Sequence, residues 1–272
     1  FAVHPLQVES VSWITGFRDV LAGFLGFLTL LFYFFHCQKR SPLLYGIATL
    51  LFLASTLAKS SSLSIIPMAL AIGIIVFKRP WRLALTEVAA WIVLIIPLFH
   101  IFSTLNNSVA LRVVHIVPLP ERFLLALDAI AFYIYKLVFP FRLTMDYGRT
   151  PQYVIQHGFH FATAVFPLAV AALAGFYWLR KRNAWPFLAG LIFFAGLIPV
   201  LGIKPFIFQH ISTVADRYAY FSLFGASVLL CSVLVKIGTR KVTLGATALY
   251  LMLLCGLTWK QLPVWKDNAS LF

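Results

Sequence analysis

Residues 1–36, FAVHPLQVESVSWITGFRDVLAGFLGFLTLLFYFFH, decide the fold because ionisable side chains stand directly before a long apolar run. The ionisable side chains that precede the apolar run are His4, Glu9, Arg18 and Asp19. The apolar run, about residues 20–36, has a length that suits a helix crossing the hydrocarbon core of a bilayer. Ionisable groups at such a boundary are energetically costly and therefore need a reason. We expect residues 1–19 to form part of a polar site on one face of a membrane protein.

The composition indicates an integral membrane protein. Of 272 residues, 61% are hydrophobic and 11% are charged, which is more apolar surface than one soluble core can bury. The apolar runs are about 16 to 20 residues long, as expected for transmembrane helices and not for the shorter strands of an outer-membrane barrel. The net charge of +14 comes from short basic clusters between these runs, so we expect no nucleic-acid partner.

The pattern predicts an all-α integral membrane fold, a multi-span helical bundle that forms one domain over residues 1–272. About eight transmembrane helices are expected, over residues 20–36, 43–58, 63–77, 83–102, 161–179, 185–203, 219–235 and 242–258. Basic turns separate them at Lys39 and Arg40, at Lys78, Arg79 and Arg82, at Arg180, Lys181 and Arg182, and at Lys236, Arg240 and Lys241. The positive-inside rule places these turns in the cytoplasm, so both ends of the chain are expected on the opposite, outer face.

The segment 123–140 is apolar but carries Asp128 and Lys136. A polar loop is expected from residue 103 up to it. If the basic turns are all cytoplasmic, both ends of 123–140 lie on the outer side, so a single crossing is forbidden by parity. We interpret it as an interfacial or re-entrant helix, with an undetected further crossing as the alternative.

The acidic residues are unevenly distributed along this topology. They are Glu9, Asp19, Glu87, Glu121, Asp128, Asp146, Asp216 and Asp267. Only Glu87 falls near the cytoplasmic side. Several of the others stand beside a base, in Arg18-Asp19, Asp146-Tyr147-Gly148-Arg149 and Asp216-Arg217-Tyr218. Such pairs either anchor loop ends or contribute to one polar site.

Transfer of a group from a lipid-linked phosphate suits this arrangement. The donor phosphate lies at headgroup depth, where Arg18, Lys59 and Arg217 are expected, and Arg binds phosphate with two parallel hydrogen bonds. A carboxylate is also needed to take the proton of an attacking hydroxyl, and Asp19 and Glu9 are the nearest candidates.

Histidines carry weaker signals. His4 either binds the donor or caps the chain locally. His157 and His160 are three residues apart, but neither a carboxylate nor a third ligand is near them in sequence, so no metal site is predicted.

Four motifs, in this order, resemble the transmembrane-and-tetratricopeptide-repeat glycosyltransferase family: FAVHPLQVESVSWITGFRDVL, LAKSSSLS, LTMDYGR and ADRYAYFS. The resemblance covers nearly the whole chain. It implies a partial GT-C fold, a polyprenyl-phosphate sugar such as dolichyl-phosphate mannose as the donor, no certain cofactor beyond this substrate, and a protein as the acceptor for O-mannosylation. The amino-acid sequences of these motifs look more like those of the bacterial members of the family than those of the animal members. This resemblance implies an inner-membrane protein that faces the periplasm rather than one in the endoplasmic reticulum.

Carried onto this chain, the resemblance gives site roles to a larger set of residues. They are His4, Glu9, Arg18, Asp19, Lys59, Asp146, Tyr147, Asp216, Arg217 and Tyr218. Gln7 departs from the pattern, because many members have a second His there. The family's acidic catalytic motif precedes the first of these segments, and its tetratricopeptide repeats follow a segment like VWKDNASLF. The chain is therefore expected to be a fragment that lacks the main base and is inactive alone.

Two other classes of function remain open. In a lipid or solute transporter or flippase, charges would line a path through the bilayer, whereas here they gather at one face. In a non-catalytic membrane scaffold, the charged turns would only be anchors. An acidic outer loop before Phe1 and 34-residue helical repeats after Phe272 would favour the enzyme.

Overall fold

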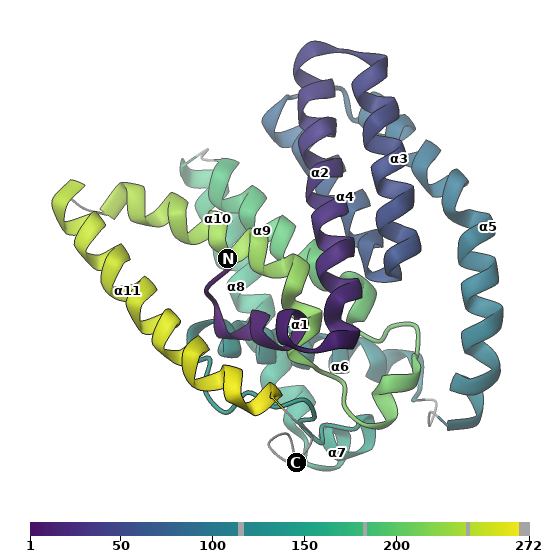
Figure 1. The fold of residues 1–272 in the computed structure, drawn as a ribbon, viewed down its shortest axis with the longest axis vertical. Coiled ribbons are helices and arrows are strands. Elements are labelled where there is room, and N and C mark those ends of the chain that lie inside the picture. The colour runs from purple at the N-terminus through teal and green to yellow at the C-terminus, as the bar shows by residue number, and fades with distance from the viewer. Residues whose placement is uncertain (114–116, 182–183, 238–239, 267–272) are drawn as a thin grey trace.

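The computed structural model describes residues 1–113, 117–181, 184–237 and 240–266 (Figure 1). Within these ranges the secondary structure is helical, and no strand is found. The α-helices are α1 (Val8–Ser12), α2 (Phe17–Lys39), α3 (Pro42–Ala58), α4 (Ile65–Ala71), α5 (Trp81–Val113), α6 (Leu119–Val138), α7 (Pro151–Gln156), α8 (Phe159–Lys181), α9 (Ala184–Leu197), α10 (Tyr220–Ile237) and α11 (Arg240–Gln261). Short 3-10 helices are η1 (Pro5–Gln7), η2 (Ile14–Gly16), η3 (Ser60–Ser64), η5 (Ile198–Val200), η6 (Ile207–His210), η7 (Asp216–Ala219) and η8 (Leu262–Trp265), and η4 (Ile72–Val76) is a π-helix. The predicted all-α, multi-span membrane bundle is confirmed.

Apolar helices occupy all eight segments that the sequence marks as spans. Four helical stretches are long and apolar enough to cross a bilayer: Ile14–Lys39, Trp81–Leu98, Asp216–Leu234 and Lys241–Trp265. The other four are shorter apolar helices: Pro42–Ala58, Ser60–Val76, Phe161–Tyr177 and Ala184–Val200. The number of crossings and their direction stay predictions.

The first basic turn shows how the sequence ends one helix and starts the next. Arg40 adopts a left-handed conformation (φ 52°), and its N–H bonds to the carbonyl of His36, which caps α2. Pro42 then occupies the first position of α3, where its missing N–H costs nothing. The helices α2 and α3 therefore pack as a tight antiparallel pair.

The connection before 123–140 differs from the prediction. The expected polar loop from residue 103 is helical up to Val113, where α5 ends. Polar side chains differ from apolar ones by only tenths of a kcal/mol in helix propensity, so a helix can outlast its apolar run. The next helix, α6, begins at Leu119 and buries both Asp128 and Lys136. These charges are eight residues apart and so share one helix face. An interfacial position of α6 remains a prediction.

Close helix packing surrounds α9 and α10. A Cβ added at Gly196 would lie 2.5 Å from the main-chain nitrogen of Ser222, and one at Gly225 would meet the main chain of Phe193. Small residues at such contacts let two backbones approach within a membrane. By contrast, α11 exposes large apolar side chains, with Leu249 67% and Met252 64% exposed, as expected for a surface that faces lipid.

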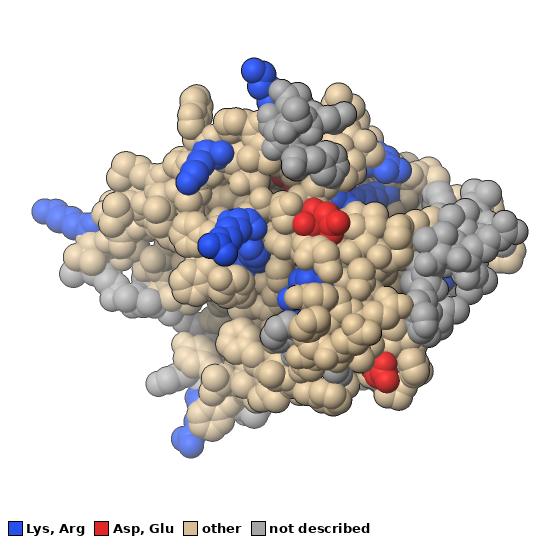
Figure 2. Space-filling view, turned by 90° about the horizontal axis from the view of Figure 1, so that it is seen from below, with Lys and Arg blue, Asp and Glu red and all other residues tan. Residues whose placement is uncertain are grey.

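Most of the predicted site residues lie at the end of the bundle opposite the turn between α2 and α3. The turn between α2 and α3 lies at the top of Figure 1, whereas α1 lies in the lower half and α7 at the bottom. Seen from below, this end shows separated basic side chains and two small acidic patches among other atoms (Figure 2). Several carboxylates of this region are absent from the surface because they are almost fully buried: Glu9 (1% exposed), Asp19 (4%), Asp128 (1%) and Asp216 (2%).

Candidate functional site

A buried ion pair joins the first motif to the last. Glu9 lies in α1, and one of its carboxylate oxygens accepts the main-chain N–H of Arg217 at 2.8 Å. Its other oxygen accepts from the Arg217 guanidinium. That guanidinium also lies over the rings of Phe208, at 4.2 Å from the centroid, and Tyr218, at 5.0 Å. Because both charged groups are removed from water, each depends on the other for compensation.

A second ion pair lies beside the first. Asp19 is in the first turn of α2, where the helix dipole favours a negative charge, and it accepts from the ammonium group of Lys59. Lys59 follows α3 in extended conformation and leads into η3. Burial lowers the pKa of Lys59, and the attraction of Asp19 opposes this shift. The charge of Asp19 acts on Glu9 and that of Arg217 acts on Lys59, so the two pairs form one electrostatic cluster.

A third group adds Asp216, Tyr147 and Lys136. The Tyr147 hydroxyl donates to Asp216 at 2.7 Å. Burial and the neighbouring Asp216 charge raise the pKa of Tyr147, so this phenol remains a donor. The ammonium of Lys136 donates to the carbonyls of Phe141 (2.6 Å) and Arg142 (3.1 Å) and lies 5.0 Å from the Tyr147 ring centroid. Lys136 therefore fixes the loop that carries Tyr147.

A fourth group ties α6 to α8. Asp128 accepts from Arg149 at 2.7 Å and from the hydroxyl of Thr163 at 2.5 Å. Asp128, Lys136 and Arg149 were not among the predicted site residues. The signal for two of them was present, because a charge inside an apolar helix needs a partner.

His4 uses both ring nitrogens on the main chain. Nδ1 accepts the N–H of Leu6 at 3.3 Å, and Nε2 lies 3.2 Å from the carbonyl of Leu137, to which it donates. Burial lowers the pKa of His4 to about 4, which fits a neutral ring. Of the two roles considered for His4, this geometry supports the local cap.

The structure brings seven of the ten predicted site residues together and leaves three outside, of which His4, the local cap, is one. Glu9, Asp19, Lys59, Asp216, Arg217, Tyr218 and Tyr147 belong to the cluster just described. Arg18 is exposed beside it, close enough for its charge to act on Lys59. Asp146 is also exposed, and its carboxylate accepts the N–H of Gly148 at 2.7 Å, which stabilises its own turn.

Neighbouring acids and bases in the sequence do not pair with each other. Asp19 pairs with Lys59 and not with Arg18, and Arg217 pairs with Glu9 and not with Asp216. Likewise, Arg149 pairs with Asp128. The reason is geometric, because consecutive residues of a helix point in different directions. The adjacent pairs read from the sequence are thus ends of long-range bridges.

No metal site is evident in the part of the chain that is described. Those residues contain no group of three or more His, Cys, Asp or Glu side chains that could hold an ion. The side chain of His160 and the whole of Asp267 lie outside the described residues.

Glu87 belongs to a separate network at the opposite end of α2. It accepts from Tyr33 (3.0 Å), His36 (3.0 Å) and both terminal nitrogens of Arg79 (3.0 and 2.8 Å). The Tyr45 hydroxyl donates to the Glu87 carbonyl at 2.8 Å. These bonds join α2, α3 and α5 and account for the one acid expected on that side.

Comparison with known proteins identifies no family. No family model, no curated protein and no solved structure matches the chain.

Proposed function

We propose that this chain is the membrane part of a glycosyltransferase that moves a sugar from a polyprenyl-phosphate donor to a hydroxyl group, on a protein, at the end of the bundle that holds the cluster. The observation that carries the proposal is the convergence of Lys59 and Arg217 with Glu9 and Asp19. These four residues come from three segments far apart in the sequence. The exposed Arg18 adds a third cation beside these four charges, and its charge acts on Lys59.

The cations have the first role in the proposed reaction. The acceptor oxygen attacks the anomeric carbon of the sugar, and the bond from that carbon to the phosphate oxygen breaks. The electron pair leaves with the phosphate, so negative charge develops there. Arg217 and Lys59, joined by the exposed Arg18, stabilise this charge. Arg217 is suited to it because its guanidinium can contact two phosphate oxygens.

The carboxylates have a positioning role in this arrangement. Glu9 and Asp19 hold Arg217 and Lys59 in place before the donor binds. The acceptor proton goes to a carboxylate, and use of Glu9 or Asp19 as that base would require its ion pair to open. The resemblance implies instead an acidic motif upstream of residue 1.

Transfer assays with the full-length protein test the proposal. The protein would be reconstituted in vesicles with polyprenyl-phosphate mannose and acceptor protein, and transferred sugar would be counted. Arg18→Ala is the cleanest variant because Arg18 is exposed, and Arg217→Lys keeps the charge while removing the guanidinium fork. Both are expected to reduce transfer at least tenfold, about 1.4 kcal/mol of lost transition-state stabilisation.

Lys39→Ala provides the control. Lys39 is an exposed base at the opposite end of α2, so its loss should leave transfer unchanged. Equal turnover of wild type, Arg18→Ala and Arg217→Lys would refute the donor site. Movement of the lipid across the bilayer without sugar transfer would favour a flippase.

A further inference from the structure

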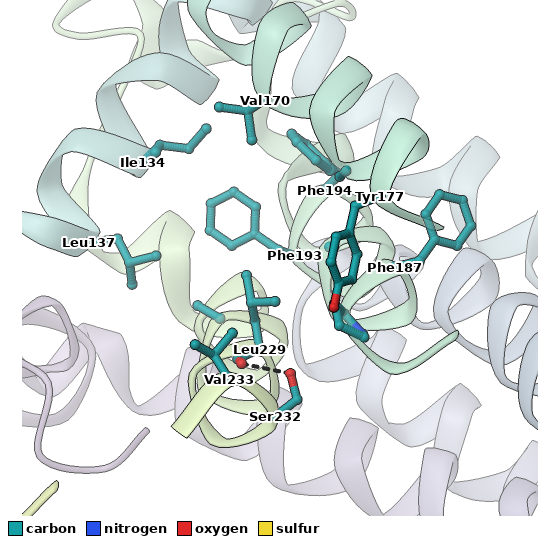
Figure 3. Close-up of a pocket in the computed structure, with 14 residues that line it drawn as sticks. Ile134, Leu137, Val170, Tyr177, Phe187, Phe193, Phe194, Leu229, Ser232 and Val233 are labelled. Atoms are coloured by element: carbon teal, nitrogen blue, oxygen red, sulfur yellow. Dashed lines mark hydrogen bonds between the residues drawn. The ribbon is translucent and has the colours of Figure 1, made fainter. Parts of the chain in front are cut away.

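A cavity of about 490 Å³ lies between α6, α8, α9 and α10, and none of the predicted site residues lines it. Figure 3 shows side chains from these four helices, among them Ile134, Val170, Phe193 and Leu229, around its open centre. The volume is within the range of small-molecule sites, about 300 to 1,000 Å³. The cavity is thus large enough to hold a ligand.

The lining excludes a polar occupant. None of the described residues that line the cavity is charged, and only Tyr177 and Ser232 bring hydroxyl groups. The Ser232 hydroxyl already donates to the Leu229 carbonyl at 2.7 Å, as drawn in Figure 3. The site therefore suits a hydrocarbon chain.

A second, more open cavity continues the first toward the basic turn after α8. It shares Ala174 and Tyr177 with the first and ends at Arg180. The Arg180 guanidinium lies 5.2 Å from the Phe176 ring centroid, and no carboxylate of the described residues is paired with it. An apolar groove thus leads to an exposed cation that has no anionic partner in the described chain.

The length of the groove points to a lipid of one leaflet. From Val170 to Arg180, α8 advances ten residues, or about 15 Å. This is half of the roughly 30 Å hydrocarbon core. A phosphate on Arg180 would therefore place an acyl chain along the groove as far as the middle of the bilayer.

The other end of the cavity suits a headgroup less well. It is lined by Leu137, whose carbonyl accepts from His4. The adjacent cation, Lys136, already donates to two main-chain carbonyls. A lipid entering from that end would meet a cation whose hydrogen bonds are in use.

We propose that this groove binds one acyl chain of an anionic phospholipid from the leaflet at the basic turns, with its phosphate on Arg180. The sequence adds Lys181 and Arg182 to the same turn. Anionic lipids are attracted to such basic clusters next to a membrane helix. The site is independent of the proposed sugar transfer.

Two variants with matched controls test the proposal. A Cβ added at Gly190, which lines the cavity, meets no atom within 4 Å, so Gly190→Leu fills the space without a clash at that atom. Gly175 is equally open but does not line the cavity, so Gly175→Leu is its control. Arg180→Gln removes the cation, and Arg82→Gln is its control because Arg82 also lies on an aromatic ring, that of Trp81.

The measurement is lipid retention by native mass spectrometry of the full-length protein in detergent. Phosphatidylglycerol and phosphatidylcholine with the same oleoyl chains would be added at equal concentration. We expect preferential retention of phosphatidylglycerol, about fivefold weaker binding in Arg180→Gln, and loss of binding in Gly190→Leu. Both controls should behave like the wild type.

Three results would overturn the proposal. One is equal retention of the two phospholipids, and another is unchanged retention in Gly190→Leu. The third is displacement of phosphatidylglycerol by polyprenyl phosphate that depends on Gly190 and not on Arg180, which would assign the groove to the donor's tail. Sugar transfer is not a readout here, so failure of this proposal and failure of the proposed function can be told apart.

Discussion

Breaking the Glu9–Arg217 pair should destabilise the protein strongly. In Arg217→Met, the Glu9 carboxylate, 1% exposed, keeps only the main-chain N–H of residue 217 as a donor. In Glu9→Gln, that N–H keeps an acceptor, but the guanidinium loses its counter-charge. Removing one partner of a buried ion pair costs about 3 to 5 kcal/mol, and we expect this loss for each single variant.

The double variant isolates the pairwise interaction. Glu9→Gln combined with Arg217→Met leaves no uncompensated charge and retains an acceptor for the main-chain N–H. We expect it to be more stable than the sum of the single losses predicts, by about 0.5 to 3 kcal/mol.

Unfolding in mixed micelles, followed by tryptophan fluorescence, gives the free energy of each variant. Lys39→Gln, an exposed change at the other end of α2, should stay within about 0.5 kcal/mol of the wild type. Single variants that lose less than about 1 kcal/mol, or losses that simply add, would show that the two groups do not compensate each other in the folded protein.

Three further predictions concern other parts of the bundle. The pKa of His4 is lowered from 6.5 to about 4, so between these pH values the folded state binds fewer protons than the unfolded state. About 3 kcal/mol of the free energy of unfolding that is present above pH 6.5 should therefore be lost as the pH falls toward 4. The Asn variant His4→Asn should flatten this part of the pH profile of the thermal midpoint; an identical profile would exclude His4 as its source. Gly225→Val should lower the free energy of unfolding by about 1 to 3 kcal/mol, because its side chain would force α9 and α10 apart. Gly245→Val is the control, because a Cβ there meets no atom within 4 Å. Equal losses of stability in the two variants, measured by denaturant unfolding, would contradict the close packing of α9 and α10. Asp128→Leu leaves Arg149 without its carboxylate partner, so we expect faster proteolysis of the loop after α6. Asp146→Ala is the control, because the carboxylate of Asp146 is exposed in the wild type. Equal cleavage rates in the two variants would argue against the Asp128–Arg149 ion pair as the contact that holds this loop.

The fold class and the positions of the helices followed from the sequence alone. Apolar runs between basic turns can only be stable as helices in a bilayer, because every main-chain hydrogen bond must be made inside the segment. This local requirement explains why helices occupy all eight predicted segments. The same requirement does not fix the conformation of polar residues at the end of an apolar run. The helix α5 continues to Val113, through a stretch that was expected to be a loop.

The candidate site was predictable in part. The sequence singled out Glu9, Asp19, Lys59 and Arg217, because charges at helix ends of an apolar chain require compensation. It suggested the wrong partners, since adjacent acids and bases were read as pairs.

The sequence thus determined that this is a helical membrane protein and which of its charges need an explanation, because hydrophobicity and charge are properties of each segment by itself. Only the tertiary structure decided which charges neutralise one another, that Lys136 and Arg149 hold the loop beside them, and where a groove opens between four helices. Those features depend on contacts between residues as far apart as Glu9 and Arg217, and the direction of a side chain across such a distance is set by packing and not by the residues next to it.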